Sequence, residues 1–201
     1  MKKISLLVLI LATGSIVFAQ SAKFGLKAGL NISTINNNAT GADWNSLLGL
    51  NAGGLAHIHL SPEWAIQPEV EFSGQGAKYT IGQGEEHSLH LNYINIPVLV
   101  QYMFDNGFRL QTGPQLGFLI DVNDKVNGQQ TNFFTSDDFK STDVSWSFGL
   151  GYLTYSGLGV DGRYNLGLTN FNKNGSNTLK NSVIQIGLFY MLDNSHKVKS
   201  R

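Results

Sequence analysis

Apolar and polar residues alternate through most of the chain. In the stretch 24–33, every second residue is apolar, and the intervening positions are mostly glycine, lysine or asparagine. A period of two is typical of a β-strand with one apolar face. The same pattern predicts seven further strands, each long enough to cross a bilayer at the tilt of a barrel strand. They lie at about 47–60, 63–73, 89–104, 108–121, 143–155, 158–169 and 182–192.

The connections between these strands alternate in length. Long polar segments lie at 34–46, 74–88, 122–142 and 170–181, and the other connections are the short turns Ser61-Pro62, Asp105-Asn106-Gly107 and Ser156-Gly157. Outer-membrane barrels have this pattern, with turns in the periplasm and loops outside. The sequence therefore predicts an all-β fold, an eight-stranded antiparallel up-and-down transmembrane β-barrel with short periplasmic turns and long extracellular loops.

The two faces of the predicted strands differ in side-chain size. One face carries most of the strand glycines together with the charges Lys27, Glu69, Glu71, Arg109, Asp121, Asp161 and Arg163. The other face is rich in bulky residues such as Trp64, Val70 and Phe148. The interior of an eight-stranded barrel is only wide enough for side chains, so the glycine-rich face is expected inside. The bulky apolar face then requires lipid around it.

Inside a narrow barrel the charges must pair, because buried charges persist only when they are paired and hydrogen-bonded. We therefore expect an ion-pair network in the lumen, centred on Glu69, Glu71, Arg109 and Arg163. Its full set is Lys27, Glu69, Glu71, Arg109, Asp161 and Arg163. Such a network would fill the bore, and the barrel would then not conduct appreciably.

Three prolines interrupt the strand pattern. Pro68, Pro97 and Pro114 fall inside predicted strands, where each removes a hydrogen-bond donor from the ladder. Near Pro97 the apolar alternation also slips by one residue, between Tyr93 and Ile94. One extra residue in the strand would cause this slip, so a β-bulge is predicted near Pro97.

The two ends of the chain differ from its middle. Lys2 and Lys3, an apolar run from residue 4 to residue 12 and small residues leading to Ala19 predict a signal peptide at 1–19. The barrel domain is then expected at 20–192, followed by a polar C-terminal tail at 193–201. The signal peptide implies export, and together with the barrel pattern it implies a location in the bacterial outer membrane.

Composition removes several classes of function. The chain has no cysteine, which excludes disulfides, thiolate metal sites and a cysteine nucleophile. Without Lys2 and Lys3, the 14 basic residues fall to 12 against 14 acidic ones, and no basic stripe remains. Nucleic acid is therefore not an expected partner.

A few polar side chains are candidates for chemistry. His57 and His59 lie two apart on one strand and, with Glu69 or Glu71, could form a small metal site, although hydrogen-bonded lumen filler is the favoured interpretation. His87 and His90 are expected on the surface. A rim hydrolase built from different strands is geometrically allowed, yet no Gly-x-Ser-x-Gly motif occurs. We expect no catalytic residues, no cofactor and no metal.

The predicted loops carry aromatic residues among small polar ones. They are Trp44, Tyr79, Phe133, Phe134, Phe139 and Phe171. Aromatic side chains in such surroundings are typical of contact surfaces, so the loop at 122–142 is the best candidate for a protein partner.

Six short stretches together resemble a known family. They are 25–31 (GLKAGLN), 94–102 (INIPVLVQY), 113–117 (GPQLG), 148–152 (FGLGY), 161–169 (DGRYNLGLT) and 185–190 (QIGLFY). In order and spacing they resemble the PorT-like outer-membrane β-barrels, small barrels common in Bacteroidetes-type bacteria. The resemblance implies the fold, outer-membrane lipid as surroundings, and the barrel-assembly and periplasmic chaperone machinery as partners. It implies no catalytic residues, and a few members are linked to protein secretion.

One feature departs from this family. Such barrels usually end on an aromatic residue that the assembly machinery recognises, whereas here the last strand ends Tyr190-Met191-Leu192 and nine residues follow.

The leading hypothesis is a non-enzymatic barrel that acts as a structural or interaction scaffold and displays four external loops. A narrow channel for ions or small solutes is the main alternative. A hydrolase at the rim and a soluble periplasmic ligand carrier are the others.

Overall fold

The computed structural model describes residues 22–37, 43–81, 85–131, 133–173 and 178–192. Its elements are β1 (Ala22–Asn37), β2 (Asp43–His59), β3 (Trp64–Ile81), β4 (Glu85–Met103), β5 (Phe108–Val126), β6 (Gln129–Thr131), the short 3-10 helix η1 (Ser136–Asp138), β7 (Thr142–Leu153), β8 (Leu158–Gly167) and β9 (Leu179–Met191).

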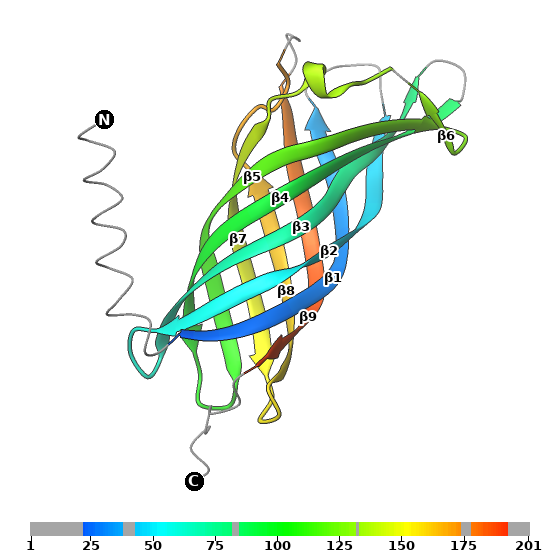
Figure 1. Ribbon diagram of the computed structural model, residues 1–201. Helices are drawn as coiled ribbons and strands as arrows, with labels where there is room; N and C mark the ends of the chain where they lie inside the picture. Colours follow the sequence, from blue (N-terminus) through cyan, green and yellow to red (C-terminus); the bar gives the residue numbers. More distant parts are fainter. Residues whose placement is uncertain (1–21, 38–42, 82–84, 132, 174–177, 193–201) are drawn as a thin grey trace, which may run out of the picture.

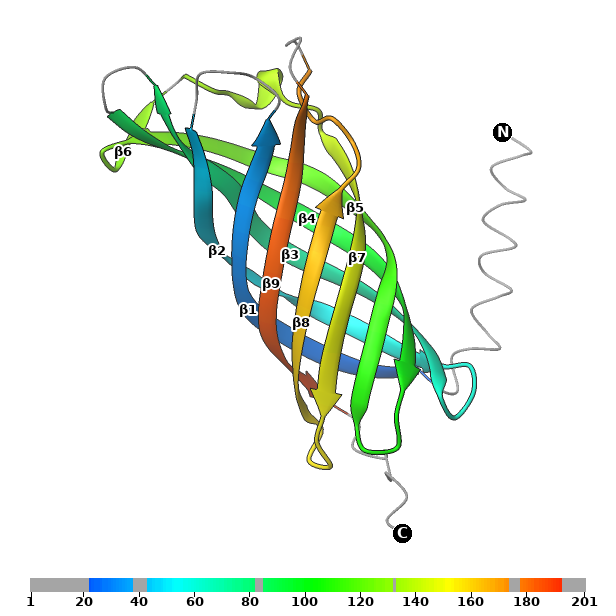
Figure 2. The ribbon, with the colours of Figure 1, turned by 180° about the vertical axis from the view of Figure 1, so that it is seen from behind.

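Eight long strands close into a ring (Figure 1; Figure 2). Each strand pairs antiparallel with its sequence neighbours, β5 pairs with β7, and β1 pairs with β9 to close the barrel. The short strand β6 pairs only with the far end of β5. The predicted eight-stranded antiparallel barrel is therefore confirmed. No helix in the described part of the chain is long and apolar enough to cross a membrane.

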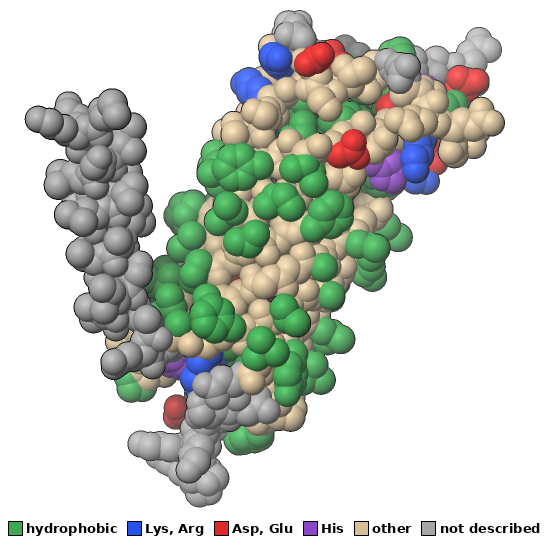
Figure 3. Space-filling view, viewed as in Figure 1, with side chains coloured by type: hydrophobic (Ala, Val, Ile, Leu, Met, Phe, Trp, Pro, Cys, Tyr) green, Lys and Arg blue, Asp and Glu red, His purple; other side chains and the backbone are tan. Residues whose placement is uncertain are grey.

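The short turns at 60–63, 104–107 and 154–157 lie at one end of the barrel, called here the turn end, and the opposite end is the loop end. Between them, large apolar side chains point outward from every long strand, as Figure 3 shows for one face. On β9, for example, Ile184, Ile186 and Leu188 are about half exposed, whereas Gln185 between them is buried. The apolar face is thus outside, as the alternation predicted.

The strands at the loop end are longer than predicted. β3 continues to Ile81 and β4 begins at Glu85, so most of the expected loop at 74–88 is strand. The expected loop at 34–46 is likewise mostly strand, in β1 and β2. The outward face becomes polar beyond the apolar band, so the apolar-out pattern ends although the hydrogen-bonded ladder continues. The remaining parts of these two loops, 38–42 and 82–84, lie outside the described residues.

The predicted bulge in β4 is wrong. Leu89, Leu91 and Tyr93 point inward in the same phase as Pro97, so β4 alternates without a slip. The extra residue lies in β5, where Asn92 pairs with Asp121 and Tyr93 with Leu119, leaving Ile120 without a partner. Asp121, expected inside, is consequently exposed.

The three strand prolines share one structural solution. The β2–β3 ladder skips the pair that would contain Pro68, the β3–β4 ladder skips Pro97, and the β4–β5 ladder skips Pro114. Each proline therefore coincides with a gap in one ladder, where its missing N–H leaves a hydrogen bond unmade, and it stays paired with the strand on its other side.

Candidate functional site

Five charged side chains from three strands meet inside the barrel. They are Lys27 on β1, Glu69 and Glu71 on β3, and Asp161 and Arg163 on β8. All five are buried. The strand alternation places each of them inward, and β3 stands opposite β8 in the ring, so their side chains reach across the lumen.

Glu69 lies at the centre of this cluster. Arg163 donates to it through both terminal nitrogens, with Nη1 at 2.8 Å from Oε2 and Nη2 at 2.6 Å from Oε1. The Lys27 ammonium donates to Oε2 at 3.1 Å, and Gln67 donates to Oε1 at 2.7 Å. A carboxylate with this many donors remains ionised when buried.

The other two carboxylates complete the pairing. The Lys27 amine lies 3.2 Å from Glu71 Oε2, and Arg163 Nη2 lies 2.8 Å from Asp161 Oδ2. Gln185 also donates to Glu71, at 3.3 Å. Each charge in the cluster therefore has an opposite charge in contact, which offsets the cost of its burial.

Arg109 does not join this cluster, although it was expected at the centre. No carboxylate of the described residues lies within 4.0 Å of its nitrogens, and its guanidinium carbon lies 5.5 Å from the ring centre of Phe189. Phe189 belongs to a small apolar layer with Leu55, Leu153 and Met191. The register of β5 places Arg109 in this layer, nearer the turn end than the ion pairs.

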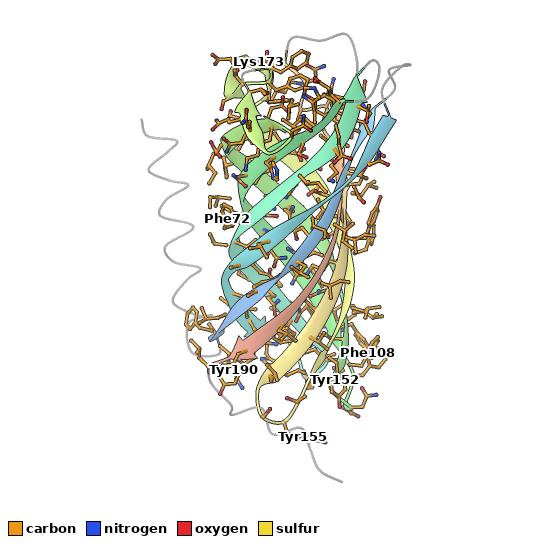
Figure 4. The ribbon with its side chains drawn as sticks, turned by 90° about the vertical axis from the view of Figure 1, so that its right-hand side faces the viewer. Phe72, Phe108, Tyr152, Tyr155, Lys173 and Tyr190 are labelled. Carbon is orange, nitrogen blue, oxygen red and sulfur yellow. The ribbon has the colours of Figure 1, made fainter. Side chains whose placement is uncertain are left out.

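Neutral polar side chains fill the lumen on the other side of the ion pairs. Asn31 accepts from Asn51 and donates to Ser73, each at 2.9 Å, and Gln115 donates to Ser145 at 3.1 Å. A cavity of about 10 Å³ remains, lined in part by Gln75, Asn95 and Asp143. This volume holds about one water molecule. Figure 4 shows side chains along the whole length of the barrel.

An apolar cluster closes the loop end. Its buried members are Ile35, Ala77, Tyr79, Leu89, Leu91, Tyr93, Phe139, Phe171 and Leu179. The rings of Trp44 and Tyr79 stack at 5.0 Å, and those of Phe139 and Phe171 lie 5.7 Å apart. Several aromatic residues expected on exposed loops are therefore buried in this apolar cluster, which is called here the plug. Phe133, in contrast, is 59% exposed.

A polar contact fixes the β5–β6 hairpin to this cluster. The Tyr79 hydroxyl donates to Asp124 at 3.1 Å and lies 3.1 Å from His87 Nδ1. Burial, and then the Asp124 carboxylate, raise the pKa of Tyr79 above its usual value, so the phenol remains a donor. His87 is buried here, which corrects the expected surface position.

The hairpin itself carries a sequence signal that was missed. Asn127 and Gly128 have φ values of 50° and 82°, the left-handed values that a two-residue hairpin turn requires. An Asn-Gly pair between strands predicts such a hairpin, which would have placed β6 within the expected loop at 122–142.

The two histidines considered as metal ligands, His57 and His59, make other contacts. His57 Nδ1 lies 3.2 Å from Gln67 Oε1, and the rings of His57 and His59 meet edge to face at 4.7 Å. Among the described residues, no three His, Asp or Glu side chains form a group suited to a metal ion. Gln67 thus links His57 to Glu69 and the ion pairs.

The chain matches the model of one protein family. The model of the outer membrane protein beta-barrel domain matches residues 18–173 of the chain. No curated protein matches the chain.

Solved structures with the same fold are distant in sequence. The attachment invasion locus protein Ail of Yersinia pestis is 12% identical, with a TM-score of 0.51, over 85% of this chain and 99% of Ail. Neisserial surface protein A is also 12% identical, with a TM-score of 0.52, over 85% of this chain and 98% of that protein. At this identity the likeness shows the fold alone.

Proposed function

The chain belongs to the outer membrane protein beta-barrel domain family and lies in the bacterial outer membrane, and from that premise we propose that it is a non-enzymatic, non-conducting scaffold. Its barrel anchors the protein in lipid, and its loop end faces the exterior as a surface for interaction. We further propose that the chain is a PorT-like barrel, with the barrel-assembly and periplasmic chaperone machinery as its partners.

The paired charges across the lumen are the observation that carries the proposal. Glu69 and Arg163 join opposite walls of the barrel, and Lys27 links Glu69 to Glu71. Apolar side chains close the bore on both sides of these pairs. A hydrated ion would have to break several charge-assisted hydrogen bonds to pass.

The interaction surface is proposed at the hairpin and the loop that follows β5. Phe133 is exposed there, while Phe139 behind it is held in the plug. A rigidly anchored loop with an exposed aromatic residue loses little entropy on binding, which favours a protein partner at 122–142.

Planar-bilayer recording with the full chain tests the closed lumen. We expect no steady conductance from the wild type. The double variant Glu69→Ser/Arg163→Ser removes both long side chains of the central pair but leaves the apolar clusters at the two ends. We therefore expect conductance only when Phe171→Ala and Phe189→Ala are added to it. Steady, well-resolved conductance by the wild type would overturn the proposal in favour of the channel. Covalent capture of the purified protein by an active-serine probe would instead support the rim hydrolase.

A further inference from the structure

An open groove of about 460 Å³ lies on the outward side of the barrel, across β5, β7, β8 and β9. Its walls include Phe148, Leu150, Tyr164, Ile184 and Ile186, and Gly162 lies at its floor. The walls of the groove are exposed apolar side chains of the outward face, so the groove is continuous with the surface that contacts lipid.

The groove exists because Gly162 faces outward between bulky neighbours. A Cβ added to Gly162 would meet no atom within 4 Å. Gly162 pairs with Leu150 on one side and with Ile186 on the other. Adjacent strands are about 4.8 Å apart, so these walls stand about 10 Å apart over a bare backbone, a width that suits a single hydrocarbon chain.

A lysine, Lys180, lies beyond the groove toward the loop end. Lys180 is on the same strand as Ile184 and Ile186, at an alternate position on the same outward face. It lies four positions before Ile184, about 13 Å along the strand. The ammonium therefore lies where the head of a lipid would be if the lipid's chain occupied the groove.

Backbone hydrogen bonds tie the segments of two more lysines, Lys140 and Lys173, to the start of β9 at Leu179 and Lys180. Phe139 and Asn172 form a bridge, Lys140 N–H donates to Phe171 O at 2.8 Å, and Phe171 N–H donates to Leu179 O at 3.0 Å. The apolar residues of this small ladder are buried in the plug, while Lys140 and Lys173 are exposed. Figure 4 labels Lys173 at the loop end.

The Lys140 amine donates to the carbonyl of Asn170 at 2.8 Å and has two further N–H donors, and none of the three amines is neutralised by a described carboxylate. No carboxylate of the described residues pairs with Lys140, Lys173 or Lys180. The Asp138 carboxylate nearby accepts from both the N–H and the hydroxyl of Thr135. On the opposite rim the arrangement differs, because Lys78 is paired with Glu86 at 2.7 Å.

We propose that this side of the barrel binds one anionic, phosphate-bearing lipid of the outer leaflet. Its hydrocarbon chain lies in the groove over Gly162, and its phosphate is held by Lys180 with Lys140 and Lys173. The apolar contact and the charge contact are each weak alone, and their alignment on one strand face makes the site selective. The assignment to the outer leaflet rests on the proposed function, in which the loop end faces the exterior.

The test uses the full chain in bilayer nanodiscs of phosphatidylcholine and phosphatidylglycerol with identical chains. Native mass spectrometry after gentle release counts the lipids that stay bound. We expect the wild type to retain one phosphatidylglycerol, and Gly162→Leu and the triple variant Lys140→Gln/Lys173→Gln/Lys180→Gln to retain it severalfold less often. The matched controls are Gly54→Leu, another outward glycine, whose added Cβ would meet only Gly25 O at 3.8 Å, and Lys78→Gln on the opposite rim. Both should behave as the wild type, with heat-modified gel mobility confirming that every variant folds.

Three results would overturn the proposal: equal retention of the two lipids by the wild type, unchanged retention in Gly162→Leu, or an equal loss in Gly54→Leu. Conversion of a dimer to a monomer by Gly162→Leu would also overturn it and would assign the groove to a second copy of the chain. Both leaflets of a nanodisc have one composition, so the result does not depend on orientation, which whole-cell labelling tests separately.

Discussion

Arg163 donates hydrogen bonds from both terminal nitrogens to the carboxylate of Glu69, at 2.8 and 2.6 Å, across the width of the barrel. The two residues are 94 positions apart and stand on opposite strands of the ring. This bidentate pair joins the two walls through the lumen, and it sets the first prediction.

Replacing Arg163 should destabilise the barrel because three buried carboxylates, Glu69, Glu71 and Asp161, are then left to share the single charge of Lys27. We expect Arg163→Ala to cost about 3–5 kcal/mol, measured by urea unfolding in lipid vesicles. Adding Glu69→Gln should recover part of the loss, because coupled residues are not additive. The control is Lys78→Ala at the exposed pair with Glu86, where the cost should be below about 1 kcal/mol. Purely additive effects would contradict the coupling.

Arg109 should matter less than Arg163. It contacts the Phe189 ring and has no ion pair among the described residues, so Arg109→Met removes a buried charge and keeps an apolar stem in the Phe189 layer. In the same unfolding assay, we expect a smaller loss than for Arg163→Met. Equal losses would mean that Arg109 pairs within the network in the bilayer.

The inward glycines should be intolerant even of alanine. A Cβ at Gly29 would lie 2.3 Å from Ile186 O and 2.7 Å from the Cα of Gly187, and both are backbone atoms that cannot move aside. We expect Gly29→Ala to cost about 1–3 kcal/mol by overpacking. The outward Gly162→Ala is the matched control, and its stability should stay close to that of the wild type. The reverse order would mean that the two faces are exchanged.

The aromatic plug should depend on its buried anchors. Phe171 is fully buried against Phe139, so Phe171→Ala should cost about 3–5 kcal/mol and open the loop end to protease. Phe133→Ala, at an exposed ring, should do neither. Limited proteolysis of the folded protein, followed by mass mapping of the cut sites, distinguishes the two outcomes.

Cysteine labelling tests which end faces outward. The natural chain has no cysteine, so each variant has a single reactive site. An impermeant maleimide added to whole cells should label Gln129→Cys in the β5–β6 hairpin and should not label Asp105→Cys in a short turn. The opposite result would invert the proposed orientation.

The number of long strands, their direction of pairing and the face of most side chains can be read from the amino-acid sequence alone, with Asp121 and the start of β4 as exceptions. These follow from a period of two and from short turns, which are local properties of the chain. The same local reasoning placed Lys27, Glu69, Glu71, Asp161 and Arg163 inside.

Which inward residues meet is set by the assembled barrel. The register around the ring brings Arg163 to Glu69 and puts Arg109 beside Phe189, and no local signal separates those two arginines. Leu89, Leu91 and Tyr93 were misread as a slip in β4 because apolar residues change from the outer face to the inner face where the lipid ends and the plug begins. The groove at Gly162 likewise requires Leu150 and Ile186 as its walls, from strands whose register the glycine cannot specify. Contacts across a barrel depend on strand register and closure, which every strand sets together, whereas the face of a side chain depends only on its own strand.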